Sequence, residues 1–225
     1  MKTANVAEAV KSEHVVALLK QMYGENRVEE NAARYQLVAD GFAKEFGDKA
    51  FEFFSAPGRT EIGGNHTDHN HGKVLAGSVH LDCVAAAAPN GTHTVNLISE
   101  TYNQHLVIDL DDLAPTEKTT GTEPLLKGIF AGLLEKGCKV EGFDAYVTSN
   151  VIGGAGVSSS ASFEMLVCVI VDHLFNEGKI DVVTYAKAGQ YAENKYWLKG
   201  SGLLDQLACA VGGMITIDFA DIENP

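Results

Sequence analysis

The chain has 225 residues, of which 45% are hydrophobic, so it can bury a sizeable core as one large domain or two small ones. Its formal charge of −13, from 17 basic and 30 acidic residues, argues against binding to nucleic acid or to an anionic membrane surface, because the overall field repels both. An anionic small ligand would have to be held by local groups.

The cysteines are spread along the chain without a C-x-x-C pair, which indicates reduced thiols rather than disulfides or a zinc site. They are Cys83, Cys138, Cys168 and Cys209. The first residues lack the apolar core of a signal peptide, and no later run of 18 apolar residues could span a membrane. We therefore expect a cytoplasmic monomer without membrane or nucleic-acid partners.

The first half of the sequence predicts two helices followed by several strands. Apolar residues recur at helical spacing before Gly24, and a second amphipathic stretch covers residues 28–46. Strand-like runs follow at residues 51–56, 77–88, 94–99 and 105–110. Asn90 and Gly91 lie between the second and third of these runs, and this dipeptide predicts a hairpin that joins them.

The second half alternates between helical and strand patterns without βαβ regularity. Helices are expected at residues 124–135, 160–175, 182–197 and 203–210, with strands at 143–151 and 213–219. This mixture predicts an α+β domain.

The first segment that can carry chemistry lies at residues 56–72, which we expect to form a loop after the first strand. Glycines interrupt a cluster of one arginine, acids, asparagines and histidines. Carboxylate and amide oxygens accept hydrogen bonds from sugar hydroxyls, and imidazole and guanidinium groups donate them. Composition leaves a solvated loop equally open. A metal site is less favoured, because His66, His69 and His71 lack helical i, i+4 spacing.

A glycine- and serine-rich segment at residues 153–162 lies between a predicted strand and a long predicted helix. Glycines let the backbone approach a ligand, and free N–H groups at the positive end of a helix favour phosphate. The hydroxyl groups add donors and a possible magnesium ligand. The segment lacks the Gly-Lys-Ser/Thr of a Walker A motif, so a flexible turn is the alternative. The strand before it and the helix after it favour phosphate binding.

The third segment contains Glu193 and Asp205, two carboxylates in apolar or neutral surroundings. Such acids are either paired structurally or used chemically. For each acid alone, helix capping or a salt bridge to Lys195 or Lys199 is the favoured interpretation.

Together, and in this order, the three segments resemble galactokinases of the GHMP small-molecule kinase superfamily from about residue 30 onward. The first signature is carried by Arg59, His66, Asp68, Asn70 and Gly72. The phosphate loop is carried by residues 154–162, and the third stretch by residues 192–194 and 204–206. The joint occurrence is far more specific than any one loop.

The resemblance implies the N-terminal domain of a GHMP kinase, with a ribosomal protein S5 domain 2-like fold, at residues 48–225. A helical extension would precede it at residues 1–47, and the C-terminal domain would be absent from this chain. The implied cofactors are ATP and Mg²⁺.

The resemblance also implies a role for each site residue. Asp205 would be the base at the anomeric hydroxyl of the sugar, with Arg59 beside it. The sugar would be bound by Asn65, His66, Asp68 and Asp205. The ATP phosphates would be held by Gly154, Gly156, Val157, Ser158, Ser159 and Ser160. Magnesium would be ligated by Ser160 and Glu193.

Three departures from the family pattern bear on these roles. Asn65 replaces a sugar-binding glutamate, and Thr122 and Leu125 replace an aromatic pair expected near adenine. The chain also ends at Pro225, before the family's C-terminal glycine-rich motif. The first departure bears on the choice of sugar, the second on purine stacking, and the third on the second wall of the active cleft.

We therefore expect ATP-dependent phosphorylation of a hexose, galactose first, with weak or no activity for the isolated chain. One alternative is a kinase for another hexose or an amino sugar, for which Asn65 is the discriminating residue. Another is a sugar-responsive binding or regulatory protein without turnover. The presence of Arg59, Glu193 and Asp205 favours the enzyme.

Overall fold

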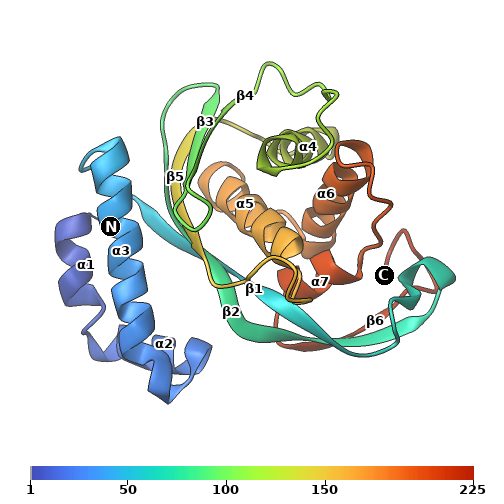
Figure 1. Cartoon of the computed structure of the whole chain (residues 1–225), viewed down its shortest axis with the longest axis horizontal. Helices are drawn as coiled ribbons and strands as arrows, with labels where there is room; N and C mark the ends of the chain where they lie inside the picture. The colour runs from blue at the N-terminus through green and yellow to red at the C-terminus, as the bar shows by residue number, and fades with distance from the viewer. Residues whose placement is uncertain (1) are drawn as a thin grey trace.

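The computed structural model describes residues 2–225, which form one mixed sheet between two layers of helices (Figure 1). The sheet contains β1 (Glu52–Gly63), β2 (Lys73–Pro89), β3 (Thr94–Ser99), β4 (Gln104–Asp109), β5 (Phe143–Ser149) and β6 (Met214–Asp218). The strand order is β1-β2-β5-β3-β4, and β6 pairs with the first part of β2. The β3–β5 pair is parallel, and the other pairs are antiparallel.

The long strand β2 organises both cores because its side chains alternate between the two faces of the sheet. Cys83, Ala85 and Ala87 face one core, and Val84, Ala86 and Ala88 face the other. The run therefore reads as continuously apolar, as expected for a strand buried on both sides. Its small side chains let helices pack closely against the sheet.

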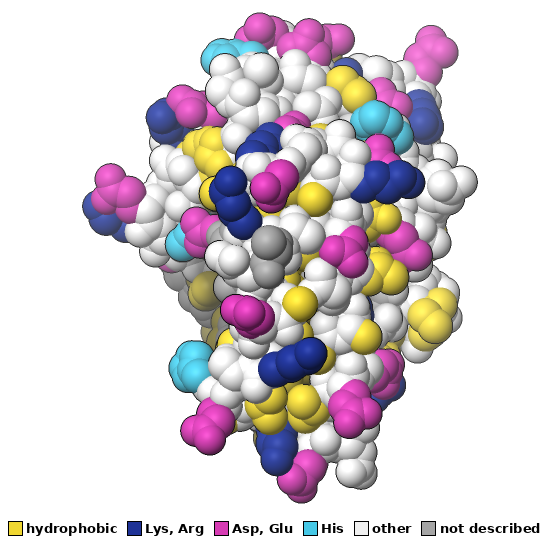
Figure 2. All heavy atoms as spheres, turned by 90° about the vertical axis from the view of Figure 1, so that its left-hand side faces the viewer, with side chains coloured by type: hydrophobic (Ala, Val, Ile, Leu, Met, Phe, Trp, Pro, Cys, Tyr) yellow, Lys and Arg dark blue, Asp and Glu magenta, His cyan; other side chains and the backbone are white. Residues whose placement is uncertain are grey.

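One face is covered by the N-terminal helices α1 (Thr3–Ala9), α2 (Glu13–Tyr23) and α3 (Val28–Phe46), with the 3₁₀ turn η1 (Glu25–Arg27) between the last two (Figure 1). The prediction of a single helix before Gly24 was wrong, because a turn at residues 10–12 separates α1 from α2. Ser12 is the N-cap of α2, and its hydroxyl accepts a hydrogen bond from Val15 N. In Figure 2, acidic, basic and apolar side chains are mixed on this side of the molecule.

The other face is covered by α4 (Thr122–Glu135), α5 (Ser159–Phe175), α6 (Val182–Lys195) and α7 (Leu204–Val211) (Figure 1). Helices α4 and α6 approach closely through glycine. A Cβ atom at Gly128 would lie 2.7 Å from Ala192 Cα, and one at Gly132 would lie 3.2 Å from Ala188 Cα. This arrangement confirms the predicted α+β fold.

The predicted hairpin at Asn90 and Gly91 does not form, because β5 lies between β2 and β3. The loop after β2 bonds instead to the residues that enter β5. Asn90 N donates to Gly142 O, Gly142 N donates to Thr92 O, and Asn90 Nδ2 donates to Asp144 Oδ1 at 2.9 Å. The hairpin in this region is β3–β4.

The structure of residues 2–225 also bears on the expectations about membrane spans and cysteines. No helix there combines the length and the apolar character needed to cross a membrane. All four cysteines are free, as predicted, and only Cys138 is not fully buried.

Candidate active site

Arg59 and Asp205 form the centre of the site. Arg59 lies on β1 and is buried, and Asp205 lies in the first turn of α7. Arg59 Nε donates to Asp205 Oδ1 at 2.9 Å, and Arg59 Nη2 forms an ion pair with the same oxygen at 2.7 Å. The Asp205 side chain keeps 29% exposure, so its carboxylate can be reached from solvent while the arginine cannot. The segment at residues 56–72, predicted as a loop, begins as strand, and this strand places Arg59.

The phosphate-loop segment lies directly on Arg59. Arg59 Nη1 donates to Gly156 O at 2.7 Å, and Arg59 N donates to Val157 O at 3.1 Å. Gly58 permits this approach, since a Cβ atom there would lie 2.6 Å from Val157 O. Ser158 has a φ of 58°, and its hydroxyl donates to Asp205 Oδ2. One arginine and one aspartate thus join β1, the glycine-serine loop and α7.

Helix α5 begins at the end of this loop, with Ser158 as its N-cap residue. The first N–H groups of a helix have no partner within the helix, and the macrodipole is positive there. Gly154 and Gly156 have φ values of 79° and 74°, which glycine adopts without strain. The predicted order of a strand, this glycine-serine loop and a helix is therefore present, with β5 before the loop and α5 after it.

Ser160 and Glu193 meet beside this helix start. Ser160 Oγ donates to Glu193 Oε1 at 2.9 Å, and Lys199 Nζ approaches the same oxygen at 2.7 Å. Glu193 is buried, although Lys199 is half-exposed. The predicted salt bridge to Lys199 thus exists, and it coexists with the contact to the loop. A hydroxyl and a carboxylate at one point are hard oxygen donors that fit Mg²⁺, which usually keeps several waters and binds nucleotide oxygens.

A cavity of about 220 Å³ opens next to these groups. The residues that line it include His66, Asp68, Glu193 and Asp205, so four predicted site residues converge. Asn65 is exposed and has a φ of 51°. Asparagine tolerates this left-handed conformation better than glutamate does, which is a physical reason for the residue found there.

Asp68 has a structural contact that sequence reasoning missed. Its Oδ2 atom accepts hydrogen bonds from the backbone N–H groups of Leu203 and Leu204, at 2.9 and 3.3 Å. Asp68 therefore caps α7 from a distant part of the chain and fixes the helix turn that carries Asp205. Gly202 leaves room for it, because a Cβ atom there would lie 1.7 Å from Asp68 Oδ2.

His66 binds an acid from the same segment. Its backbone N–H donates to Glu61 Oε1 at 3.3 Å, and its Nε2 lies 3.4 Å from Glu61 Oε2. Within residues 2–225, no three His, Cys, Asp or Glu side chains converge on a metal-sized site.

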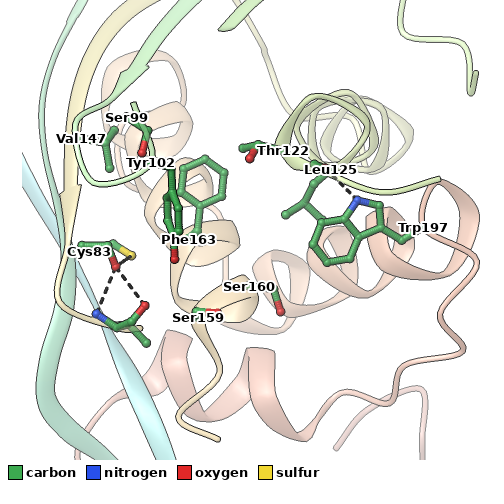
Figure 3. Close-up of a pocket in the computed structure, with 13 residues that line it drawn as sticks. Cys83, Ser99, Tyr102, Thr122, Leu125, Val147, Ser159, Ser160, Phe163 and Trp197 are labelled. Atoms are coloured by element: carbon green, nitrogen blue, oxygen red, sulfur yellow. Dashed lines mark hydrogen bonds between the residues drawn. The ribbon is translucent and has the colours of Figure 1, made fainter. Parts of the chain in front are cut away.

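A second cavity of about 210 Å³ lies at the start of α5, with Ser159 and Ser160 in its lining (Figure 3). Thr122 and Leu125, which replace the expected aromatic pair, also line it. Aromatic side chains come from other elements: Tyr102 follows β3, Phe163 lies on α5 and Trp197 follows α6. Trp197 Nε1 donates to Gly121 O at 2.9 Å, which fixes the indole against α4 (Figure 3). These three were not predicted, because no local motif marks them.

Family models match two parts of the chain. A galactokinase galactose-binding signature covers residues 40–89, and the GHMP kinase N-terminal domain covers residues 124–213. The mevalonate kinase of Methanococcus jannaschii shares the fold, with a TM-score of 0.63, 17% identity, and coverage of 76% of this chain and 55% of that structure. The fold and the glycine-serine loop thus define the N-terminal domain of a GHMP kinase.

Relatives with higher identity narrow the class. Galactokinases of Clostridium tetani and Ligilactobacillus salivarius are 34% and 36% identical over 76% and 79% of this chain, which correspond to 43% and 46% of their own lengths. The crystal structure of Lactococcus lactis galactokinase complexed with galactose matches with a TM-score of 0.77 and 31% identity, over 84% of this chain and 50% of that one. The chain belongs to the galactokinase family. It spans about half the length of the curated relatives it matches.

Proposed function

We propose that this chain supplies the sugar site and the phosphate loop of an ATP-dependent galactose kinase, which phosphorylates the anomeric hydroxyl of the sugar. The observation that carries the proposal is the double contact of Arg59, with Asp205 on one side and the phosphate-loop carbonyl of Gly156 on the other. It joins all three predicted segments at one point, beside the cavity of about 220 Å³. The galactokinase relatives and the galactose-binding signature support the choice of sugar.

The side chains can divide the reaction as follows. Asp205 accepts the proton of the attacking hydroxyl, because its carboxylate lines the cavity next to the loop. The N-terminus of α5 and the loop N–H groups hold phosphate oxygens. Ser160 and Glu193 would hold Mg²⁺, which neutralises phosphate charge. Phosphoryl transfer depends mainly on such positioning and charge neutralisation. The free cysteines fit a reducing compartment such as the cytoplasm.

The adenine base would occupy the second cavity, where Trp197 and Tyr102 offer aromatic surface. This placement puts the base and the sugar in separate cavities that meet near Ser160, which lines the second cavity and bonds to Glu193 in the lining of the first. Purine stacking would then come from the segment after α6 and from the β3–β4 connection instead of from positions 122 and 125.

A coupled assay of ADP release with a panel of sugars tests the proposed function. We expect release with galactose by the full-length protein, and turnover below about 1 per second for the 225-residue chain by itself. Release only with an amino sugar or another hexose would assign that substrate instead. Tight sugar binding without turnover would indicate a regulatory protein, and the absence of any sugar binding would contradict the proposal.

Ser160→Ala and Glu193→Gln should each raise the magnesium concentration for half-maximal rate, by about 10-fold. Ser160→Ala removes one oxygen ligand, and Glu193→Gln removes the negative charge of the other while it keeps the shape of that side chain in the cavity lining. The measurement is a magnesium titration of the initial rate, with galactose affinity determined in parallel by calorimetry. If both variants lose galactose affinity at a constant magnesium response, the assignment of these residues is wrong.

Trp197→Ala should weaken ATP binding by about 10-fold, since stacking of a base on an aromatic ring contributes about 1–3 kcal/mol. Galactose affinity should stay the same, because the indole lies outside the sugar cavity. Trp197→Phe is the matched control and should retain most of the affinity. Equal ATP affinity in the Ala variant and the unchanged protein would remove Trp197 from the base site.

A further inference from the structure

Glu164 is a buried acid to which the proposed reaction assigns no role. It lies on α5 and is completely inaccessible to solvent. Burial, reinforced by the nearby negative charge of Glu193, raises the pKa of Glu164 to about 8. Burying an acid costs free energy of folding, and an apolar residue of similar size would stabilise the core more. An acid kept at this position therefore calls for a reason other than stability.

The contacts of Glu164 lead to both carboxylates of the proposed site. Gln206 Nε2 donates to Glu164 Oε2 at 3.1 Å and lies 3.4 Å from Glu193 Oε2. Gln206 directly follows Asp205 on α7, and Glu193 lies on α6. One amide group therefore connects α5, α6 and α7 immediately behind the residues assigned to proton transfer and to magnesium.

Glu164 and Gln206 are closely packed against Gly189, but not all of their polar atoms are hydrogen-bonded. A Cβ atom at Gly189, inside α6, would lie 2.5 Å from Glu164 Oε2 and 3.1 Å from Gln206 Cγ. Glycine inside a helix costs about 1 kcal/mol relative to alanine, so its presence is explained by this close approach. The atoms Glu164 Oε1 and Gln206 Oε1 are buried and have no hydrogen-bond partner among residues 2–225.

We propose that Glu164 and Gln206 are positioning residues that fix Glu193 and Asp205 relative to the phosphate loop. Glu164 holds the amide of Gln206 in one orientation, and that amide holds the Oε2 side of Glu193, which leaves Oε1 for Ser160. The same amide restrains the helix turn that carries Asp205. Partners behind a metal ligand typically change metal affinity by 10–100-fold when they are removed. This inference rests on the proposed function, since it assumes that Glu193 binds magnesium.

The test compares Glu164→Met with Glu164→Gln in the full-length protein. The probe is Mn²⁺ in the presence of ADP, measured from the loss of the free-ion EPR signal. We expect Glu164→Met to keep or raise the thermal midpoint and to weaken Mn²⁺ binding by about 10-fold or more. Glu164→Gln keeps the size and one acceptor and should stay within about 3-fold of the unchanged protein. A merely structural role predicts a change in stability and none in Mn²⁺ affinity.

Gly189→Ala offers a second route, because the new methyl group displaces Glu164 Oε2 without deleting it. We expect weaker Mn²⁺ binding again. Gly132→Ala is the matched control: it crowds the same helix α6 from α4, next to Ala188, and its new methyl group is directed at α6 rather than at Glu164. It should destabilise the protein without changing Mn²⁺ affinity.

Failure of this inference and failure of the proposed function give different results. If Glu193→Gln weakens Mn²⁺ binding while Glu164→Met and Gly189→Ala leave it unchanged, the positioning role is wrong and the metal site stands. If Glu193→Gln also leaves Mn²⁺ binding unchanged, the metal assignment itself is wrong. If Gly132→Ala weakens Mn²⁺ binding as much as Gly189→Ala does, general disturbance of α6 explains the effect, and the positioning role is overturned.

Discussion

Replacing Asp205 by Asn is expected to slow the chemical step by about a hundredfold or more, while sugar binding survives. A sugar hydroxyl is a poor nucleophile at neutral pH, so a carboxylate that accepts its proton lowers the barrier as the bond to phosphorus forms. The amide keeps the size of the side chain and one acceptor oxygen. That oxygen would face Arg59, which donates to Oδ1 here, and the amide N–H₂ would face the hydroxyl of Ser158.

The measurement separates binding from chemistry. Galactose affinity is determined by calorimetry, and the single-turnover rate by quench flow with saturating ATP and magnesium, both on the full-length protein. Asp218→Asn is a matched control, because that carboxylate pairs with Lys73 on the surface of β2 and β6 and lies outside both cavities. If Asp205→Asn keeps more than about half the chemical rate, then Asp205 is a structural residue and no base is required.

The predictable part of the site is the part whose residues are close together in sequence. The glycine-serine loop can be predicted from its composition and from its position between a predicted strand and a predicted helix. In the structure it lies between β5 and α5. The contact between Ser158 of this loop and Asp205 joins residues that are 47 positions apart. The contact between Arg59 and Asp205 joins residues that are 146 positions apart. Family resemblance could supply these pairings, whereas periodicity could not.

Contacts that depend on tertiary packing alone escaped prediction. Asp68 was expected to bind sugar, and sequence gave no sign that it caps α7, because the cap spans 135 residues. Trp197 follows α6 without any motif around it, and only the folded chain brings it to the cavity beside the loop. Glu164 reads as one polar residue in an apolar helix, so its link to Gln206 also depends on how α5 and α7 meet.

Local signals failed where a later segment competed for the same backbone. Asn90-Gly91 is a strong hairpin signal, yet β5 pairs with β2 in place of β3, and residues 90–92 bond to Gly142. The strand partner is therefore chosen by the buried sheet, in which Ala85 and Ala87 of β2 and Ala145 and Val147 of β5 share one core. The break between α1 and α2 was missed for a different reason, because apolar residues continue on both sides of Ser12.

The N-terminal helices are attached to the sheet by a buried polar cluster around Asp82. Arg34 Nη1 lies 2.6 Å from Asp82 Oδ1, and Arg34 Nη2 donates to Asp82 O at 2.7 Å. Tyr23 Oη and Ser55 Oγ donate to Asp82 Oδ2. Burial is the main reason that the pKa of Tyr23 lies well above its usual value, and the neighbouring Tyr35 and Asp82 add to it, so Tyr23 remains a hydrogen-bond donor at neutral pH. The cluster thus joins α2, α3, β1 and β2.

Arg34→Met is expected to destabilise the protein by about 3–5 kcal/mol, because it leaves the carboxylate of Asp82 buried without its cation. Methionine fills a similar volume, so the loss reports the missing charge and hydrogen bonds more than a cavity. Urea denaturation at neutral pH measures this loss from the shift in midpoint at constant slope.

Lys20→Met is the matched control, since it breaks the exposed Lys20–Glu25 pair of the same helical layer, and its midpoint should not move measurably. The double variant Arg34→Met, Asp82→Asn should be less unstable than the sum of its single changes, because the asparagine leaves no charge behind. Additive losses, or an Arg34→Met midpoint equal to that of Lys20→Met, would show that this ion pair does not hold the helical layer to the sheet.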